Sequence, residues 1–363
     1  MSVQRHRVVV VGGGPAGCAA ALVLARAGIC VTLLARHVES RARPIESLPP
    51  QAAPLLRQFG VWDAFLASNP DRSPGNLSLW GDAVPRATDF IFNPHGCGWH
   101  VDRTAFDRML VSAARQAGAD ARSGAAVNRI DRIGGKWHIR YRDENGEQGV
   151  EANWLVLATG RTGGPLPPMI SRKRSDRLCA CFTLVAAPQR NHDPRTWIES
   201  TPHGWWYSAP VSASTLALAY FTDADLVPRG ASERTAALSR GLAGTHLISQ
   251  RVSGVPSEWL VRDARTSTLS SCCGEGWVAV GDAAFSMDPL SSSGIPFALE
   301  TGRRAAKAIM LGLAPEQYEA WIAGTQHSYL CGHRRHYAQE KRWPGSTFWK
   351  RRQTCEPNAA SMR

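Results

Sequence analysis

A glycine and a carboxylate stand together late in the chain, in a segment whose residue types suit a polar ligand. An apolar run at residues 277–280 leads into Gly281 and Asp282, and then come Asp288, Pro289, a Ser/Gly turn and an apolar stretch that predicts a helix. A carboxylate at a strand end, beside a helix N-terminus, favours a ligand with both hydroxyl groups and an electron-rich edge. A flavin dinucleotide is a ligand of this kind.

A second segment of this type lies near the N-terminus. Residues 7–11 are a short run rich in valine, which predicts a buried parallel strand. Residues 12–17 match G-x-G-x-x-G, with a proline where the first turn of a helix tolerates one. An Ala- and Leu-rich stretch ends at Gly28, and residues 30–34 predict the next strand. This order favours a dinucleotide site over a tight turn that binds nothing.

One position departs from the usual pattern of such units. An acidic residue at the end of the second strand usually binds the ribose hydroxyls. Here Ala35 occupies that position, and Arg36 follows it. Either another group holds the adenosine ribose, or the cofactor binds less tightly than usual.

Length and composition predict an α/β protein with an inserted domain. At 363 residues and 44% apolar content, the chain is long enough for a cofactor domain and a smaller insertion. Residues 1–170 and 265–325 are assigned to the cofactor domain, residues 171–264 to a strand-rich domain that covers a pocket, and residues 326–363 to a basic C-terminal segment. Since no apolar run reaches the roughly 18 residues of a membrane span and no signal peptide is recognisable, we expect a cytoplasmic protein without membrane contact.

The nine cysteines predict neither a metal site nor a disulfide framework. None of them forms a C-x-x-C pair, and their number is odd. We therefore expect no bound metal, and we interpret most of them as small buried residues.

The net charge of +12 is concentrated partly at the C-terminal end. Basic clusters at residues 333–336, 341–342 and 350–352 are interleaved with Trp343, Phe348 and Trp349. No nucleic-acid-binding module is recognisable, so nucleic acid is not an expected partner. The favoured interpretation is a solvated basic surface, and a docking face for an acidic protein partner is the alternative.

Four motifs, in this order and spacing, carry a family resemblance. They are the glycine loop, residues 98–107 (GWHVDRTAFD), residues 158–161 (ATGR) and residues 281–290. Together they resemble FAD-dependent monooxygenases of the hydroxylase and halogenase superfamily, as far as about Leu313. The resemblance implies a glutathione-reductase-type FAD-binding fold with an inserted antiparallel β-sheet and a helical C-terminal tail. It also implies FAD, molecular oxygen as co-substrate, and a flavin C4a-hydroperoxide that hydroxylates an electron-rich aromatic.

Features that halogenases add to this pattern are missing here. Residues 204–210 resemble the halogenase W-x-W-x-I-P signature, but Tyr207 and Ala209 replace its second Trp and its Ile. Residues 73–81, where the halogenase lysine is expected, contain no lysine. Ser291 stands where tryptophan halogenases have a glutamate. These differences make halogenation the alternative and hydroxylation the favoured reaction.

Within the superfamily, a further set of segments points to one group of enzymes. Residues 46–50, 79–81, 98–100 and 204–208 are most similar to flavoproteins that mature tryptophylquinone-containing amine oxidases and dehydrogenases. Those flavoproteins oxygenate a tryptophan in a partner protein or peptide. The resemblance therefore implies an indole substrate, with a peptidyl tryptophan as the most specific candidate.

The site residues follow from the motifs and from the resemblance. The predicted FAD contacts are Gly12, Gly14, Pro15, Ala16, Gly17, Arg36, Arg103, Gly160, Gly281, Asp282, Pro289, Ser292, Ser293, Gly294 and Ile295. His100 and Glu46 are the candidate catalytic bases, each with a structural role as the competing interpretation. Trp205, Trp206 and Tyr207 are predicted to line the substrate pocket, or else to belong to the core of a sheet.

No second G-x-G-x-x-G segment is present to hold a nicotinamide cofactor. The electron donor is therefore either transiently bound NAD(P)H or a separate flavin reductase. A flavin dehydrogenase or reductase acting on a small molecule, and a non-catalytic FAD-binding scaffold, stay open as other classes.

Overall fold

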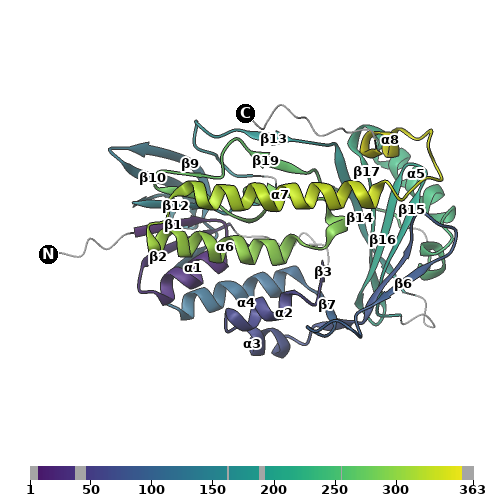
Figure 1. Cartoon of the computed structure of the whole chain (residues 1–363), viewed down its shortest axis with the longest axis horizontal. Helices are drawn as coiled ribbons and strands as arrows, with labels where there is room; N and C mark the ends of the chain where they lie inside the picture. The colour runs from purple at the N-terminus through teal and green to yellow at the C-terminus, as the bar shows by residue number, and fades with distance from the viewer. Residues whose placement is uncertain (1–6, 37–45, 162, 188–192, 255, 354–363) are drawn as a thin grey trace. The chain divides into compact units, whose positions relative to one another are not determined.

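The chain divides into a unit around a mostly parallel sheet and a unit around a seven-stranded sheet. The computed structural model describes residues 7–36, 46–161, 163–187, 193–254 and 256–353 (Figure 1). Unit 1 comprises Met1–Arg72, Phe92–Asp176 and Asp263–Gly324, and unit 2 comprises Ser73–Ile91, Arg177–Arg262 and Thr325–Arg363. The predicted boundaries near residues 170 and 264 lie close to these. Residues 73–91 and the C-terminal segment, however, belong to unit 2.

A mostly parallel sheet forms the centre of unit 1. Its strand order is β20-β21-β12-β1-β2-β8. The strands are β1 (Arg7–Val11), β2 (Cys30–Ala35), β8 (Asp120–Ser123), β12 (Trp154–Leu157), β20 (Cys273–Gly274) and β21 (Trp277–Ala279). Val8, Val9 and Val10 are fully buried. The predicted order of strand, glycine loop, helix and strand is confirmed, because α1 (Pro15–Arg26) connects β1 to its parallel neighbour β2.

Helices cover one face of this sheet, and a meander covers the other (Figure 1). α1 packs closely against α6 (Gly294–Leu311), since a Cβ atom added at Gly302 would lie 2.3 Å from the carbonyl oxygen of Ala16. α4 (Arg103–Gln116) lies on the same side. The meander consists of β9 (Ala126–Ile133), β10 (Lys136–Asp143) and β11 (Gly146–Ala152).

Short elements complete unit 1. One small sheet contains β3 (Glu46–Leu48), β7 (Gly98–Val101) and β4 (Asp71–Ser73), and another contains β13 (Arg172–Arg174), β19 (Ser267–Leu269) and β22 (Phe285–Ser286). The helices α2 (Ala52–Gln58) and α3 (Trp62–Ala67) follow β3, and the single turns η3 (Gly281–Ala283) and η4 (Pro289–Ser291) precede α6.

Unit 2 is built on a seven-stranded sheet of order β18-β14-β17-β16-β15-β5-β6. The strands are β5 (Gly75–Leu79), β6 (Arg86–Asp89), β14 (Leu178–Ala186), β15 (Thr196–Thr201), β16 (Gly204–Ser212), β17 (Thr215–Asp223) and β18 (Leu260–Asp263). The antiparallel sheet implied by the resemblance is therefore confirmed. It also takes in residues 73–91, because β5 pairs with β15 in parallel. Together with α5 (Ala231–Ala243), the sheet encloses a core around Trp206 and Trp259.

Two aromatic residues of the C-terminal segment, Phe348 and Trp349, are part of the interior of unit 2. α7 (Pro315–Tyr337) leads into this segment, and α8 (Thr347–Gln353) ends its described part. Phe348 and Trp349 are fully buried, and the indole N–H of Trp349 donates to the carbonyl oxygen of Thr201 at 2.9 Å. No helix among the described residues is both long enough and apolar enough to cross a membrane.

Several cations of this segment are also used within unit 2. Arg351 and Arg352 each lie 2.7 Å from the buried carboxylate of Asp223. Arg342 lies 2.6 Å from Glu340, whose side chain is fully buried. The interpretation of the segment as a solvated basic surface is therefore corrected only for these three arginines, whereas Arg335, Lys341 and Lys350 are exposed.

Replacing Trp349 with alanine is expected to lower the free energy of unfolding by about 3–5 kcal/mol, because the cavity left by a fully buried indole cannot collapse completely. The matched control is Trp343→Ala, at a partly exposed position, for which a loss of at most about 1 kcal/mol is expected. Urea unfolding followed by far-UV circular dichroism measures both. Equal losses would contradict the core role of Trp349.

Candidate functional site

The glycine loop brings the start of α1 very close to the ends of β1 and β12. Gly12 has a φ of +122°, and a Cβ atom there would lie 2.0 Å from the carbonyl oxygen of Ala158. A Cβ atom at Gly17 would lie 2.0 Å from the carbonyl oxygen of Gly12. Both positions therefore require glycine for packing within the protein. Gly14 differs, because a Cβ atom there would meet nothing within 4 Å.

The open position at Gly14 adjoins a helix N-terminus without a side-chain cap. Gly14 is the N-cap of α1 and Pro15 the first helical residue, so the next backbone N–H groups, at Ala16 and Gly17, have no partner within the helix. Thr159, just after β12, lies beside Gly12, and its Oγ1 is buried without a hydrogen-bond partner. Uncapped N–H groups, an orphan hydroxyl and space for close approach fit the pyrophosphate of a dinucleotide.

Asp282 lies in η3, directly after β21, at the carboxyl end of the central sheet. Its neighbour Gly281 has a φ of +59°, and a Cβ atom there would lie 2.7 Å from the side chain of Ala16. The glycine therefore lets η3 approach α1. The N–H of Gly281 donates to Thr301 Oγ1 at 2.8 Å, which ties the turn to α6.

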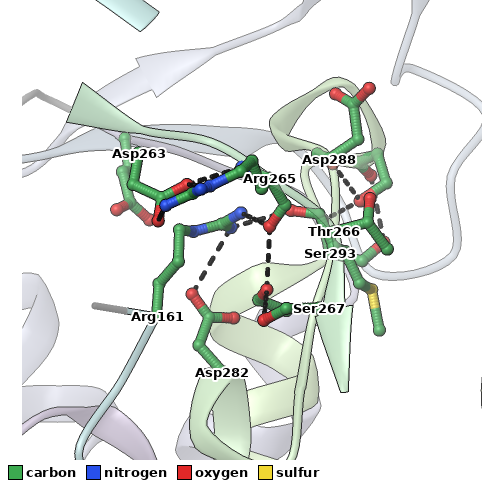
Figure 2. Close-up of polar contacts among 12 residues, drawn as sticks. Arg161, Asp263, Arg265, Thr266, Ser267, Asp282, Asp288 and Ser293 are labelled. Carbon is green, nitrogen blue, oxygen red and sulfur yellow. Dashed lines mark hydrogen bonds and ion pairs between the residues drawn. The ribbon is translucent and has the colours of Figure 1, made fainter. Parts of the chain in front are cut away.

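Arg161 fixes the surroundings of the Asp282 carboxylate. Figure 2 shows its guanidinium group pointing toward Asp282, and the nearest nitrogen and oxygen atoms are 3.4 Å apart. The same group donates to the carbonyl oxygens of Arg265 at 2.9 Å and Met287 at 2.7 Å. Arg172 holds the turn from another side by donating to the carbonyl oxygens of Asp282 and Ala283.

Burial raises the pKa of Asp282, and the positive charge of Arg161 partly offsets this effect. The charge of Glu46 further raises the pKa of this carboxyl group, and the charge of Arg103 lowers it. Sequence reasoning did not select Arg161 or Thr159 as site residues. Their only signal was their position in the motif at residues 158–161.

The segment between η3 and α6 presents a second uncapped helix start. Asp288 is buried and accepts from the N–H of Leu290 at 2.9 Å, which shapes the turn. Ser292 has a φ of +48°, and Ser293 is the N-cap of α6 without a side-chain cap bond. A Cβ atom at Gly294 would meet nothing within 4 Å. The backbone N–H groups at this end of α6 are therefore suited to an electron-rich ligand edge.

The other predicted cofactor residues differ in their exposure to solvent. Arg36, Pro289, Ser292 and Gly294 are exposed, whereas the side chain of Ile295 is buried and can contribute only backbone groups. Gly160 has a φ of +72° with open space around it.

Arg103 lies between two carboxylates at the start of α4. Its guanidinium group is hydrogen-bonded to Glu46 on β3 and lies 3.3 Å from Asp107, one turn further along α4. Burial lowers the pKa of Arg103, but Glu46 and Asp107 outweigh it and raise this pKa above its ordinary value. Glu46 therefore neutralises the charge of Arg103. This role differs from the predicted role of Glu46 as a catalytic base.

His100, the other candidate base, lies on β7 opposite Ser47 of β3. Its side chain is almost completely buried, and its Nδ1 lies 3.1 Å from Ser47 Oγ. The structure thus brings Glu46, His100 and Arg103 together around one small sheet of unit 1.

The three aromatic residues predicted for the substrate pocket lie on β16 in unit 2. Trp205 and Trp206 point to opposite faces of the sheet, because successive strand residues alternate. Trp205 stacks on Phe221 with ring centroids 3.9 Å apart, whereas Trp206 lies in the core beside Trp259. The sheet-core alternative therefore applies to Trp206, while the pocket role of Trp205 and Tyr207 stays a prediction. Tyr207 is half-buried on the face of Trp205.

Comparisons with known proteins agree with this geometry. The model of a family described as FAD binding domain matches residues 5–313. A putative FAD-dependent oxidoreductase, LodB of Marinomonas mediterranea, is 30% identical to this chain over 96% of it and 97% of its own length.

Two solved structures share the fold over nearly the whole chain. QhpG, a peptidyl tryptophan dihydroxylase essential for tryptophylquinone cofactor biogenesis, is 26% identical, with a TM-score of 0.82 over 96% of this chain and 79% of QhpG. CmlS, a flavin-dependent halogenase, is 23% identical, with a TM-score of 0.84 over 99% of this chain and 69% of CmlS. The glycine loop with its open Gly14, the uncapped starts of α1 and α6 and the match over residues 5–313 lead to one conclusion: the chain belongs to the FAD-binding domain family and is an FAD-dependent oxidoreductase.

Proposed function

We propose that this enzyme is a monooxygenase that hydroxylates the indole ring of a tryptophan in a partner protein or peptide. The observation that carries the proposal is the absence of a lysine from residues 73–81, which form the strand β5 and its flanks. A halogenase of this superfamily is expected to pass its halogen through a lysine there. The similarity to QhpG, at 26% identity, supports a peptidyl tryptophan as the substrate.

The residues of unit 1 provide distinct contacts for FAD. The N–H groups at the start of α1 and Thr159 would hold the pyrophosphate, and Asp282 would accept from the ribityl hydroxyls. The start of α6 would face the electron-rich edge of the ring. When FAD is bound and reduced, its chemistry is to react with molecular oxygen. Reducing equivalents come from NAD(P)H or from a separate flavin reductase.

The direct test is co-expression of this chain with a candidate partner protein, followed by mass spectrometry of the partner. We expect mass gains in steps of one oxygen atom, localised to a tryptophan. A Gly14→Val variant, designed to lose FAD, serves as the matched control. An unchanged partner in the presence of reduced FAD and oxygen would contradict the proposal. A halogen mass gain in the presence of chloride or bromide would support halogenation, the second candidate.

The base role of His100 stays a prediction with its own test. A general base in this reaction contributes about 100-fold or more to the rate. The His100→Ala variant should therefore form product at least about 100-fold more slowly while it retains full FAD occupancy. Ser47→Ala, which removes the contact to His100 Nδ1, is the milder comparison. Unchanged product formation in His100→Ala would show that the base role is wrong.

The Thr159→Val variant should bind FAD about 5- to 10-fold more weakly than the native chain, because it removes the orphan hydroxyl assigned to the cofactor. Valine preserves the shape of the side chain, so the unfolding free energy of the FAD-free protein should not fall. Titration of the flavin fluorescence measures the affinity. Unchanged affinity would show that Thr159 Oγ1 does not contact the cofactor.

A further inference from the structure

The C-terminal part of unit 2 carries far more positive than negative charge. Residues 325–353 contain seven lysine and arginine residues and a single acidic residue, Glu340. The side chain of Glu340 is fully buried and is bound to Arg342. Arg351 and Arg352 also form ion pairs within unit 2. The segment therefore contains no acidic side chain that could neutralise its other four cations.

These four cations lie at the C-terminal end of α7 and on α8. Arg334 and Arg335 belong to the last turn of α7, Lys341 follows that helix, and Lys350 is on α8. Arg335, Lys341 and Lys350 are exposed, and Arg334 is half-buried. No ion pair joins Arg334, Arg335 or Lys341 to another of the residues that the structure describes. Their charge is therefore presented to solvent.

α8 packs against this end of α7 (Figure 1). The ring centroids of Tyr337 and Trp349 are 5.7 Å apart, and the side-chain amide of Gln353 donates to the carbonyl oxygen of Glu340. The four cations thus gather around one helix–helix contact. We call them the basic patch: Arg334, Arg335, Lys341 and Lys350.

The aromatic residues near the basic patch are not available to stack on nucleic-acid bases. Proteins that bind single-stranded nucleic acid usually combine a positive groove with accessible aromatic rings. Phe348 and Trp349 are fully buried, and the guanidinium group of Arg342 covers the ring of half-buried Trp343 at 4.3 Å from its centroid. These three rings therefore do not form a platform for bases.

The described part of this segment also lacks apolar anchors for a membrane surface. A helix that lies on a membrane buries an apolar face among the lipids in addition to its electrostatic attraction. Among the described residues, every large apolar side chain that is exposed lies outside residues 325–353. Charge is therefore the main means of attraction that the basic patch offers, and this favours an acidic polypeptide as its ligand.

We propose that the basic patch binds an acidic segment of the polypeptide whose tryptophan this enzyme hydroxylates. The inference rests on the proposed function for the identity of that partner, and it concerns docking, whereas the reaction itself takes place elsewhere. Opposite charges on two partners accelerate their association and fix their relative orientation. Because the cations are exposed, the attraction should act mainly on the association rate and should weaken with added salt.

The first experiment titrates the FAD-loaded, full-length protein with a fluorescently labelled poly-glutamate peptide and measures fluorescence anisotropy. The Arg335→Glu/Lys341→Glu double variant should bind the peptide at least about 10-fold more weakly than the native protein. The matched control is Arg229→Glu/Arg240→Glu, which changes the net charge equally at two other exposed positions of unit 2. It should bind within about 3-fold of the native protein. Equal weakening in both variants would overturn the proposal, because the affinity would then follow net charge alone.

A second double variant guards against effects on folding. A glutamate near the C-terminal end of α7 is disfavoured by the helix dipole, whereas glutamine carries no charge. Arg335→Gln/Lys341→Gln should therefore keep the native far-UV circular dichroism spectrum and FAD affinity. It should still bind the peptide about 3-fold or more weakly than the native protein. Unchanged peptide affinity in this variant would contradict the proposal.

The same titration with a single-stranded oligonucleotide, and with vesicles that contain phosphatidylserine, tests the other polyanions. The basic-patch variant Arg335→Glu/Lys341→Glu and the matched control should weaken the binding of each by similar factors. A loss confined to the basic-patch variant, and larger for the oligonucleotide or the vesicles than for the peptide, would overturn the assignment to an acidic polypeptide.

The last experiment measures oxygen incorporation into the candidate partner protein. Arg335→Glu/Lys341→Glu should raise the KM for the partner at least about 10-fold and leave kcat unchanged, since the basic patch acts in docking. Added salt should raise the native KM more than that of the variant, because salt screens exposed charges. An unchanged KM would overturn the proposal. If no protein transfers oxygen, the proposed function is wrong, and the peptide titration still decides whether the basic patch binds acidic polypeptide.

Discussion

The Gly14→Val variant is expected to fold as the native chain does and to bind FAD at least about 100-fold more weakly. A side chain at Gly14 meets no protein atom within 4 Å, and the backbone there has a φ of −82°, which any residue adopts. The substitution therefore costs the protein little, but it fills the space beside the uncapped start of α1. Losing two hydrogen bonds to a charged pyrophosphate accounts for about 3 kcal/mol or more, which corresponds to the 100-fold effect.

Gly17→Ala is the matched comparison, and the opposite pattern is expected for it. A Cβ atom at Gly17 would lie 2.0 Å from the carbonyl oxygen of Gly12, so the loop must shift. Overpacking of this kind costs typically about 1–3 kcal/mol of stability. Thermal unfolding of the FAD-free proteins and fluorescence titration with FAD separate the two effects. If Gly14→Val were destabilised as much as Gly17→Ala, Gly14 would be a packing glycine and not a ligand-approach position.

The glycine loop could be predicted from the sequence because its geometry is local. The strand, the loop and the helix follow one another within about 20 residues, and the motif itself requires the close approach. Distinguishing the three glycines was not possible from the motif. Gly12 and Gly17 are constrained by atoms of Ala158 and of the loop, and only the folded structure shows that Gly14 is open.

The C-terminal segment shows where sequence patterns fail. Clusters of arginine with interleaved aromatics are typical of exposed surfaces, so the sequence pattern predicts a solvated face for Trp349 and Arg352. Their partners, Thr201 and Asp223, lie more than 120 residues earlier in the chain. Nothing in the local sequence indicates such pairings. The same holds for β5, which joins the sheet of unit 2 by pairing with β15. The periodicity of the sequence does not show which distant strand β5 pairs with.

The role of Arg161 does not follow from the motif in which it lies. The position follows β12 in a segment that resembles a family motif, yet the sequence does not show that the side chain reaches Asp282, Arg265 and Met287. These three partners come from segments more than 100 residues away. Among the charged groups that act on Asp282, Arg161 most strongly opposes the rise in its pKa that burial causes.

The Arg161→Met variant is expected to bind FAD about 10- to 100-fold more weakly at neutral pH, and its affinity should fall further as the pH is lowered. Burial already raises the pKa of Asp282, and Arg161 opposes that effect. Removing the guanidinium group therefore raises the pKa further and increases the protonated fraction at a given pH. A protonated carboxyl group is a weaker acceptor for ribityl hydroxyls, and each lost charge-assisted bond costs about 1.5–3 kcal/mol.

The sign of the pH dependence distinguishes this electrostatic effect from simple loosening of the loops. Native FAD affinity should decline as the pH falls through the raised pKa of Asp282, and in Arg161→Met the decline should begin at a higher pH. In Arg161→Lys, which keeps a positive charge, the pH at which FAD affinity begins to fall should shift back toward that of the native protein. Only part of the affinity should return, because lysine cannot reproduce the paired bonds to the carbonyl oxygens of Arg265 and Met287. Fluorescence titration with FAD at a series of pH values measures all three proteins. A uniform loss of affinity in Arg161→Met, with no displacement along the pH axis, would mean that Arg161 acts through packing alone and that the ionisation of Asp282 does not govern the binding of the cofactor.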